Sequence, residues 1–318
     1  MGRGAMAKLW FLGEALIDFV PAASEAGDAF APRCGGSPYN AAKAAALAGA
    51  DVGFLGAIST DMFGDRLAAD IAASGVDTGH IPRVPEPTTL AFVELVGGEA
   101  RYAFFNTGTA TATMRPDPAA FPGAPGDVLS LGSISLIDAP GAGNLTAYAE
   151  MLSHRATLSL DPNARPGMTP DAEAWRARIR TLADLSGILK LSEEDLAFLA
   201  PGLAPRDFAE AQIARGTGLV TVTHGAAGAE AFVAAGRVFR DAHKVEVVDT
   251  VGAGDTVTGY LLATLAAQGL TGRAALAAVD LDTVGDALDH ALAASALTCT
   301  VVGCAPPTLV EVAAFRAA

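Results

Sequence analysis

Cysteines, cationic residues and long apolar runs are all scarce in this chain of 318 residues. Its 3 cysteines (Cys34, Cys299 and Cys304) form no CxxC pair, so reduced thiols are expected rather than a disulfide framework. Lys and Arg total 21 against 35 for Asp and Glu, and the net charge of −14 argues against nucleic acid, whose binding depends on cationic contacts to phosphates. An anionic small molecule is not excluded, since a glycine turn and a metal ion can receive phosphate locally.

No uninterrupted apolar run approaches the roughly 18 residues of a membrane span, so no membrane partner is expected. Residues 1–8 lack the apolar core of a secretory signal, and we expect a cytoplasmic protein with residues 1–7 as a disordered tail or an expression remnant. GxxxxGK is absent, which excludes a P-loop NTPase. Gly252-Ala253-Gly254 comes too late for a Rossmann dehydrogenase and lacks the third glycine. The 5 histidines are scattered, which disfavours a metal hydrolase.

Short apolar runs alternate with helical stretches through the middle of the chain. The runs cover residues 127–131, 156–160 and 187–191, and the stretches include residues 145–153 and 172–182. This alternation predicts an α/β fold with a doubly wound, mainly parallel sheet flanked by helices. With 51% apolar residues, the chain can bury a sizeable core.

The most informative stretch covers residues 245–255. A β-branched run predicts a strand over residues 245–248, a turn follows at Gly252-Ala253-Gly254, and helical spacing begins near Ala253. The glycines let a ligand approach the backbone, and a helix start adds unpaired N–H groups, so the turn suits an anion. Asp255 then suits a base held beside a phosphate that is transferred, although a simple turn with an N-cap explains the same residues.

The heptapeptide Asp249-Thr250-Val251-Gly252-Ala253-Gly254-Asp255 resembles the C-terminal signature of the ribokinase-like (PfkB-type) sugar kinases. In that family the Gly-Ala-Gly turn forms the anion hole and the last Asp is the catalytic base. The resemblance therefore implies these roles for Gly252, Ala253, Gly254 and Asp255, with ATP and Mg²⁺ as cofactors. It covers the chain from about Leu9 to Val312 and implies one kinase domain over residues 8–316.

Two further segments are similar to the bacterial fructokinases of this family and imply a sugar site. Gly13-Glu14-x-Leu16-Ile17-Asp18 follows the first predicted strand, which residues 14–19 are expected to continue, and Asp18 would bind sugar hydroxyls. Gly36 and Asn40 would contact the sugar from residues 35–42, where Ser37 is a candidate N-cap and Pro38 stands at the first helical position. A solvent-facing strand residue and an ordinary glycine loop are the alternatives.

Residues 88–96 and 100–105 flank Gly97-Gly98 and predict a β-hairpin. Both arms are apolar, so the hairpin should pack on another strand or on a partner, and a homodimer through this region is an expectation. The resemblance implies a β lid over the sugar, formed by about residues 15–35 and 86–106. Arg101, Phe104 and Asn106 are then candidate sugar contacts, with a purely structural role as the alternative.

The resemblance extends to the nucleotide side. Asp161-Pro162-Asn163-Ala164-Arg165 follows a strand, and Asn163 and Arg165 are candidates for contact with substrate or nucleotide phosphate. The remaining candidates are Lys190, Ser192, Thr223, Gly225 and Gly228 for the nucleotide, Asp195 for Mg²⁺ through water, and Asp249 and Thr250 for K⁺. The alternative for Ser192 and Asp195 is a helix-capping pair. His224 is expected to be a loop residue without a partner acid.

The function implied by the resemblance is ATP-dependent phosphorylation of a primary hydroxyl of a small sugar, with fructose as the first candidate. Kinases of 2-keto-3-deoxygluconate, ribose or a nucleoside are the alternatives within the family; Asn106, where an arginine would bind a substrate carboxylate, favours a neutral sugar. A catalytically inactive sugar sensor is the alternative of a different class. It is suggested by Asp195 in place of glutamate and by a C-terminal tail without its basic residue.

Overall fold

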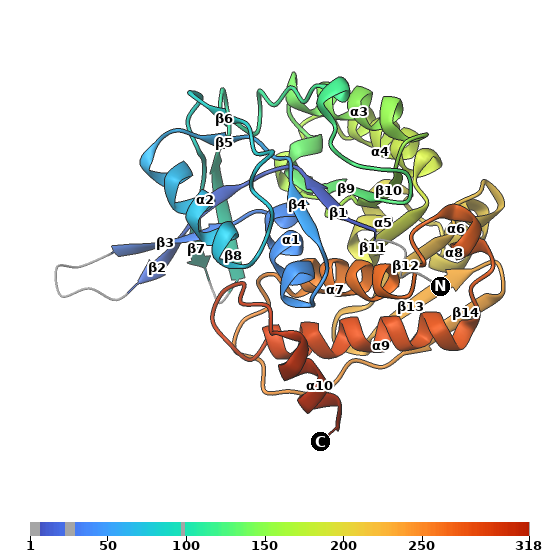
Figure 1. Cartoon of the computed structure of the whole chain (residues 1–318). Helices are drawn as coiled ribbons and strands as arrows, with labels where there is room; N and C mark the ends of the chain where they lie inside the picture. Colours follow the sequence, from blue (N-terminus) through green and yellow to red (C-terminus); the bar gives the residue numbers. More distant parts are fainter. Residues whose placement is uncertain (1–6, 23–28, 97–98, 318) are drawn as a thin grey trace.

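The structure is a computed structural model that describes residues 7–22, 29–96 and 99–317; the side chains of residues 94–102 lie outside this description. Within these ranges, eight strands form one large sheet (Figure 1). Its order is β14 (Gly236–Arg240), β13 (Ala229–Val233), β12 (Leu219–Thr223), β11 (Ile188–Ser192), β10 (Thr157–Asp161), β9 (Val128–Gly132), β1 (Leu9–Leu12) and β4 (Val52–Phe54). The pairs from β12 to β4 are parallel, and β13 and β14 add an antiparallel edge. The α/β prediction is therefore confirmed.

Helices pack on both faces of this sheet, and each face has its own apolar core. One core includes side chains of α1 (Ser37–Leu47), α2 (Met62–Ala73), α7 (Ala253–Ala267), α8 (Arg273–Ala277), α9 (Leu281–Thr298) and α10 (Leu309–Ala317). The other includes side chains of α3 (Gly141–Leu152), α4 (Ala172–Leu185), α5 (Glu193–Leu199) and α6 (Pro205–Ala214). In the described ranges, no helix has both the length and the apolar character needed to cross a membrane.

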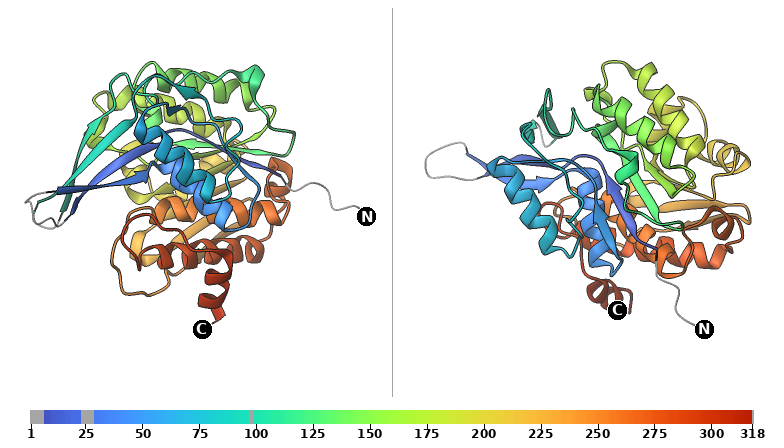
Figure 2. Two further views of the ribbon diagram at one scale, coloured as in Figure 1. Left: turned by 60° about the vertical axis from the view of Figure 1, so that its left-hand side comes forward. Right: turned by 45° about the horizontal axis from the view of Figure 1, so that its top comes forward.

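A second, four-stranded sheet extends from the main body, as Figure 2 shows. Its order is β3 (Ala29–Gly35), β2 (Leu16–Ala22), β7 (Thr89–Val96) and β8 (Glu99–Phe105). The two predicted hairpin arms are β7 and β8, which pair antiparallel; Gly97 and Gly98 lie outside the described residues, as do residues 1–6 of the expected tail. The expectation that residues 14–19 continue the first strand is wrong, because β1 ends at Leu12 and β2 belongs to the small sheet.

The predicted strand over residues 245–248 is also absent from the structure. These residues form no ladder; Val247 and Val248 are exposed, and the amides of Val248 and Asp249 donate to the carbonyl of Cys299 at the end of α9. β-branched residues favour extended backbone, but a strand also needs a neighbour with free hydrogen-bonding groups. Here the hydrogen-bond acceptor is the carbonyl of Cys299 at the end of α9, and not a neighbouring strand.

One smaller difference concerns the start of α1. The N-cap of α1 is Gly36 rather than Ser37, which is the first residue of the helix. Outside the two larger sheets, β5 (Ile58–Ser59) pairs with β6 (Arg83–Val84) in a separate two-stranded sheet.

Candidate active site

The glycine turn before α7 presents backbone donors. Gly252 has φ 79°, a left-handed conformation, and a Cβ added there would lie 2.1 Å from Sγ of Cys304, so a side chain does not fit. In the described part of the chain, the amides of Gly252, Gly254 and Asp255 have no acceptor. Together with the positive end of the α7 dipole, these free amides make the turn suitable for a phosphate.

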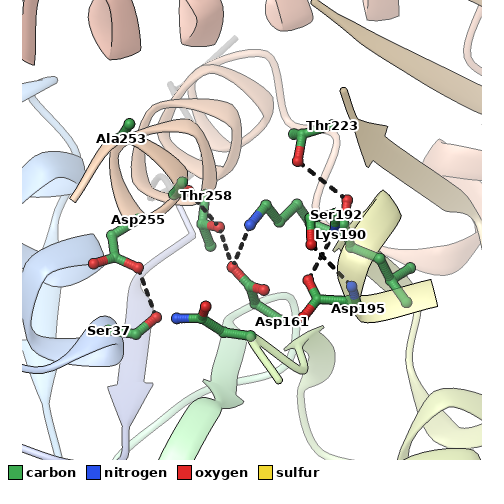
Figure 3. A network of polar contacts seen from close by, with 12 residues as sticks. Ser37, Asp161, Lys190, Ser192, Asp195, Thr223, Ala253, Asp255 and Thr258 are labelled. Carbon is green, nitrogen blue, oxygen red and sulfur yellow. Dashed lines mark hydrogen bonds and ion pairs between the residues drawn. The ribbon is translucent and has the colours of Figure 1, made fainter. Parts of the chain in front are cut away.

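Asp255 lies in the first turn of α7 and is buried against the start of α1. Its Oδ1 accepts a hydrogen bond from Oγ of Ser37 at 2.7 Å, and its Oδ2 accepts one from Nδ2 of Asn40 at 2.9 Å. Figure 3 shows the contact with Ser37. Burial raises the pKa of Asp255, although the two hydrogen bonds oppose the rise. The carboxylate is therefore fixed in orientation and more basic than an exposed one.

The packing of α1 on α7 explains why these groups meet. A Cβ added to Gly259 of α7 would lie 2.5 Å from the carbonyl oxygen of Ala41, so only glycine permits this approach of the two helices. Ser37 and Asn40 then face Asp255, although they are 218 and 215 residues away in the sequence.

A second carboxylate, Asp18, lies on β2 near Asp255. Its Oδ2 would be 2.3 Å from a Cβ on Gly35 of the neighbouring strand, so the side chain lies over that glycine. Burial and the nearby charge of Asp255 raise the pKa of Asp18 to about 6, while Arg165 acts in the opposite direction. In the described ranges no hydrogen bond occupies this carboxylate, so it can accept hydroxyl groups of a ligand.

Glu14 is a site residue whose role the sequence did not reveal, although it lies within the Gly-Glu segment. It is 1% exposed; Oε1 accepts the amide of Ser37 at 3.0 Å and Oε2 accepts the amide of Ser135 at 3.3 Å. Burial raises the pKa of Glu14, and these hydrogen bonds counteract the rise. Glu14 thus ties the start of α1 to the segment after β9.

Lys190 joins three elements below the glycine turn (Figure 3). Its Nζ lies 3.0 Å from Oδ2 of Asp161, which also accepts a hydrogen bond from Oγ1 of Thr258 at 2.7 Å. Burial opposes the charge of the ammonium, but the carboxylates of Asp161 and Asp195 outweigh it and raise the pKa of Lys190. A Cβ added to Gly254 would lie 3.3 Å from Nζ, so this buried cation lies beside the anion turn. No sequence pattern indicated the partners Asp161 and Thr258.

Ser192 and Asp195 form a capping box at the start of α5, which confirms the capping interpretation. Oγ of Ser192 accepts the amide of Asp195 at 3.0 Å, and Oδ2 of Asp195 accepts the amide of Ser192 at 2.7 Å. Oδ1 of Asp195 accepts the amide of Ala164 at 2.5 Å. Both carboxylate oxygens are therefore occupied, and no group of three or more His, Cys, Asp or Glu in the described ranges could hold a metal ion.

Two of the predicted polar residues interact chiefly with each other. Arg165 is exposed, and its Nη1 donates to Oδ1 of Asn163 at 2.6 Å and to the carbonyls of Asn163 and Ala164. Asn163 has φ 39°, which asparagine tolerates better than most residues. The charge of Arg165 still acts on Asp18 and Asp255, since it opposes the rise that burial causes in the pKa of both carboxyls.

The nucleotide-side candidates lie around the end of β12. Oγ1 of Thr223 donates to the carbonyl of Leu191 at 3.4 Å, and the turn η4 (Gly225–Ala227) leads to Gly228. The expectation for His224 is wrong in one respect, because two acids contact it. Its Nδ1 lies 2.8 Å from Glu193, and its Nε2 lies 3.1 Å from Glu230. His224 thereby links α5 to β13.

The candidates of the small sheet differ in what they can offer a ligand. Asn106 is buried; its Nδ2 donates to Asp138 at 2.7 Å, and its Oδ1 accepts hydrogen bonds from Thr89 and Thr109. Phe104 packs against the cluster of Leu16, Ala91 and Ile134. The side chain of Arg101 lies outside the described residues. Asn106 therefore supports the sheet from within.

Asp249 connects the turn to the C-terminal tail. Its Oδ1 accepts the amide of Val251 at 3.0 Å, and its Oδ2 accepts the amide of Gly303 at 2.8 Å. The next residue, Cys304, contacts Gly252. The backbone of Thr250 accepts the amide of Ala253 at 3.2 Å, so residues 249–253 and the tail form one connected unit.

Comparison with known proteins shows which family the chain resembles. The model of the pfkB family of carbohydrate kinases matches residues 6–310. A fructokinase of Rhizobium leguminosarum bv. trifolii is 37% identical over 84% of this chain and 82% of its own length. The fructokinase of Xylella fastidiosa, solved with bound ATP, superposes with a TM-score of 0.88 at 31% identity and covers 98% of each chain.

The fructokinase of Vibrio cholerae O395, solved with fructose, ADP and a calcium ion, superposes with a TM-score of 0.84 at 26% identity and covers 98% of this chain and 99% of its own. A double mutant of that enzyme was solved with fructose, ADP and a potassium ion. The family match spans nearly all of the sequence, including the turn, the two carboxylates and the small sheet described above. The chain therefore belongs to the pfkB family of carbohydrate kinases, and it is a sugar kinase.

Proposed function

We propose that the protein transfers the γ-phosphoryl group of ATP to a primary hydroxyl of fructose. The observation that carries the proposal is the position of Asp255, a buried, oriented carboxylate beside three free backbone amides. Relatives of this protein are named fructokinases; one was solved with ATP and another with fructose and ADP, which supports ATP and fructose as the two substrates.

In the proposed reaction the hydroxyl oxygen forms a bond to the γ-phosphorus, and the bond from that phosphorus to the β–γ bridging oxygen breaks. ADP leaves with that electron pair, and the hydroxyl proton passes to a carboxylate oxygen of Asp255. The free amides of Gly252, Gly254 and Asp255 and the ammonium of Lys190 neutralise charge on the transferred group. Because these donors are fixed before the reaction, little reorganisation is needed.

Mg²⁺ would supply further neutralisation of the phosphate charges when ATP is bound. Both carboxylate oxygens of Asp195 already accept backbone amides, so Asp195 would contact Mg²⁺ through a water molecule rather than directly. For K⁺ we propose Asp249 and Thr250; both carboxylate oxygens of Asp249 already accept backbone amides, so its main-chain carbonyl is the oxygen that remains for the ion. The Vibrio double mutant was solved with a potassium ion, which supports the proposal that this enzyme also binds K⁺.

For the sugar we propose Asp18, Gly36 and Asn40 as contacts, with the small sheet acting as a lid that excludes water. Asp18 lies on that sheet and is close enough for its charge and that of Asp255 to interact, which supports a ligand between them. Phe104, Arg101 and Arg165 remain candidates from the sheet and the loop after β10. Asn106 is proposed to hold the lid rather than to touch the sugar.

For the nucleotide we propose Ser192, Thr223, Gly225 and Gly228. Ser192 and Thr223 end adjacent parallel strands, and such strand ends line the ligand crevice of open α/β sheets. ATP and a metabolic sugar are found in the cytoplasm, and we propose that location for the enzyme.

The function is tested by ATP consumption with Mg²⁺ and K⁺ against fructose, 2-keto-3-deoxygluconate, ribose and adenosine. Saturable turnover with fructose at the highest kcat/KM is expected. Preference for another acceptor would overturn the fructose assignment but keep the kinase. Sugar binding without turnover of any acceptor would indicate the inactive sensor.

The ionisation of Asp18 should make sugar affinity depend on pH. Since its pKa is raised from 3.8 to about 6, the carboxylate is lost as the pH falls through that value. We expect KM for fructose to rise about 10-fold between about pH 7 and pH 5, as expected for a group with a pKa near 6. Sugar affinity therefore rises with pH, whereas folding stability falls. Between about pH 4 and pH 6 the folded state keeps the proton on Asp18 that the unfolded state releases, so the free energy of unfolding decreases as the pH rises through this range.

The measurement is KM and kcat for fructose across this pH range, for the parent and for Asp18→Asn. The variant should have a high KM that no longer varies with pH in this window. An unchanged pH profile of KM in Asp18→Asn would contradict the assignment of the titration to Asp18.

We also propose that two copies of the chain associate through the small sheets. Four aromatic rings gather on one face: Phe92 stacks on Phe19 with 4.6 Å between centroids and meets Phe30 and Phe105 edge-on. Phe30 and Phe105 remain 47% and 60% exposed. An exposed aromatic cluster of this kind suits the same cluster on a second copy.

Replacing Phe30 and Phe105 by serine should weaken the dimer at least about 10-fold, because each large ring buried at the interface contributes on the order of 1.5 kcal/mol or more. Sedimentation velocity across a concentration series measures the change. Phe239→Ser, a half-exposed phenylalanine on β14, is the matched control. A parent protein that is monomeric throughout would contradict the proposal.

A further inference from the structure

A cavity of about 570 Å³ lies between β3, α1, α2 and the tail that follows α9. Its lining includes Arg33, Lys43, Arg66 and Asp70, together with residues 302–305. Three cationic side chains against one carboxylate are unusual in a chain with a net charge of −14. The cavity therefore forms a local positive region in an acidic protein.

The pairing of these groups leaves two guanidinium groups available. Nζ of Lys43 lies 2.6 Å from Oδ2 of Asp70, which also accepts the hydroxyl of Tyr39, so the acid is already satisfied. Nη2 of Arg66 donates to the carbonyl of Pro32, and no carboxylate lies within ion-pair distance of it in the described ranges. Arg33 likewise has no ion-pair partner there. Two guanidinium groups that line one cavity and have no carboxylate partner in the described ranges suit the oxygens of a phosphate group.

The cavity adjoins the catalytic turn. Cys304 lines it, and Sγ of the same residue occupies the space where a side chain on Gly252 would have been. Burial is the main cause that raises the pKa of this thiol, so the thiol stays neutral and adds no negative charge to the cavity. An occupant would contact the small sheet, α1 and the tail at once.

We propose that this cavity binds a phosphate group, either inorganic phosphate or a phosphate monoester, at a site separate from the one that receives the γ-phosphoryl group. The guanidinium groups of Arg33 and Arg66 donate hydrogen bonds to the phosphate oxygens, and Lys43 of α1 adds positive charge. Binding links the small sheet to the segment that supports Gly252, and it stabilises the folded chain.

The test is titration calorimetry with inorganic phosphate, carried out with saturating Mg²⁺, fructose and a non-hydrolysable ATP analogue, whose γ-phosphoryl group occupies the catalytic turn. We expect one phosphate per chain, and a loss of affinity of at least about 10-fold in Arg33→Gln/Arg66→Gln, because each guanidinium contributes charge-assisted hydrogen bonds. The melting temperature should rise with phosphate in the parent and not in this variant. Arg180→Gln/Arg215→Gln, which removes the same charge from exposed positions outside the cavity, should behave as the parent.

Fructose 6-phosphate distinguishes the two sources of the phosphate group. If the bound phosphate group belongs to the sugar acceptor, fructose 6-phosphate is phosphorylated and inorganic phosphate competes with it. If free phosphate is the ligand, phosphate binding is independent of fructose. No phosphate binding beyond the catalytic turn, or equal binding by the two double variants, would overturn the proposal. The experiment measures phosphate binding rather than turnover, so its outcome is independent of whether the protein phosphorylates fructose.

Discussion

Replacing Asp255 by asparagine is expected to lower kcat for fructose phosphorylation by at least about 100-fold, or about 2.7 kcal/mol of barrier. Asparagine keeps the size of the side chain but cannot accept the hydroxyl proton. It can still receive a hydrogen bond from Ser37 or Asn40, so KM for fructose should change little. Steady-state kinetics at saturating ATP measures both constants.

The stability of the same variant separates catalysis from folding. Because burial raises the pKa of Asp255, its ionised form is disfavoured in the fold, and removing the charge should cost no more than about 1 kcal/mol through a lost hydrogen bond. Asp207→Asn, the same change at an exposed acid in the first turn of α6, is the control. Turnover near that of the parent in Asp255→Asn would show that another group takes the proton.

Replacing Lys190 by methionine should lower the free energy of unfolding by roughly 3–5 kcal/mol, the usual cost of leaving one partner of a buried ion pair alone. The partner here is Asp161, which is 5% exposed, and its Oδ1 has no hydrogen-bond partner in the described ranges. Urea or thermal unfolding measures the loss. Lys8→Met, which breaks a partly exposed pair with Asp77, should cost no more than about 1 kcal/mol.

A second variant separates charge compensation from catalysis. Lys190→Met/Asp161→Asn removes both charges while keeping an acceptor for Thr258, so it should recover much of the lost stability. It should not recover activity, because the ammonium beside Gly254 is still missing. Full activity in this double variant would show that Lys190 serves the fold alone.

Local features were predicted well from the sequence because they depend on a few neighbouring residues. The helix start at Ala253, the capping pair Ser192 and Asp195, and the arms of the hairpin follow from backbone preferences and hydrophobic period. Two errors have the same origin. Residues 245–248 favour extended backbone but find no strand to pair with, and Ser37 suits an N-cap but donates its hydroxyl to Asp255 instead.

The sequence by itself determined the α/β class, the glycine turn and, through its resemblance to the sugar kinases, the candidate base Asp255. Only the tertiary structure decided which distant groups surround that base: Ser37 and Asn40 from α1, Lys190 with Asp161 below the turn, and the arginine-lined cavity beside Cys304. The physical reason is that such contacts depend on how closely elements pack, as α1 and α7 do at Gly259, and no local preference encodes that distance.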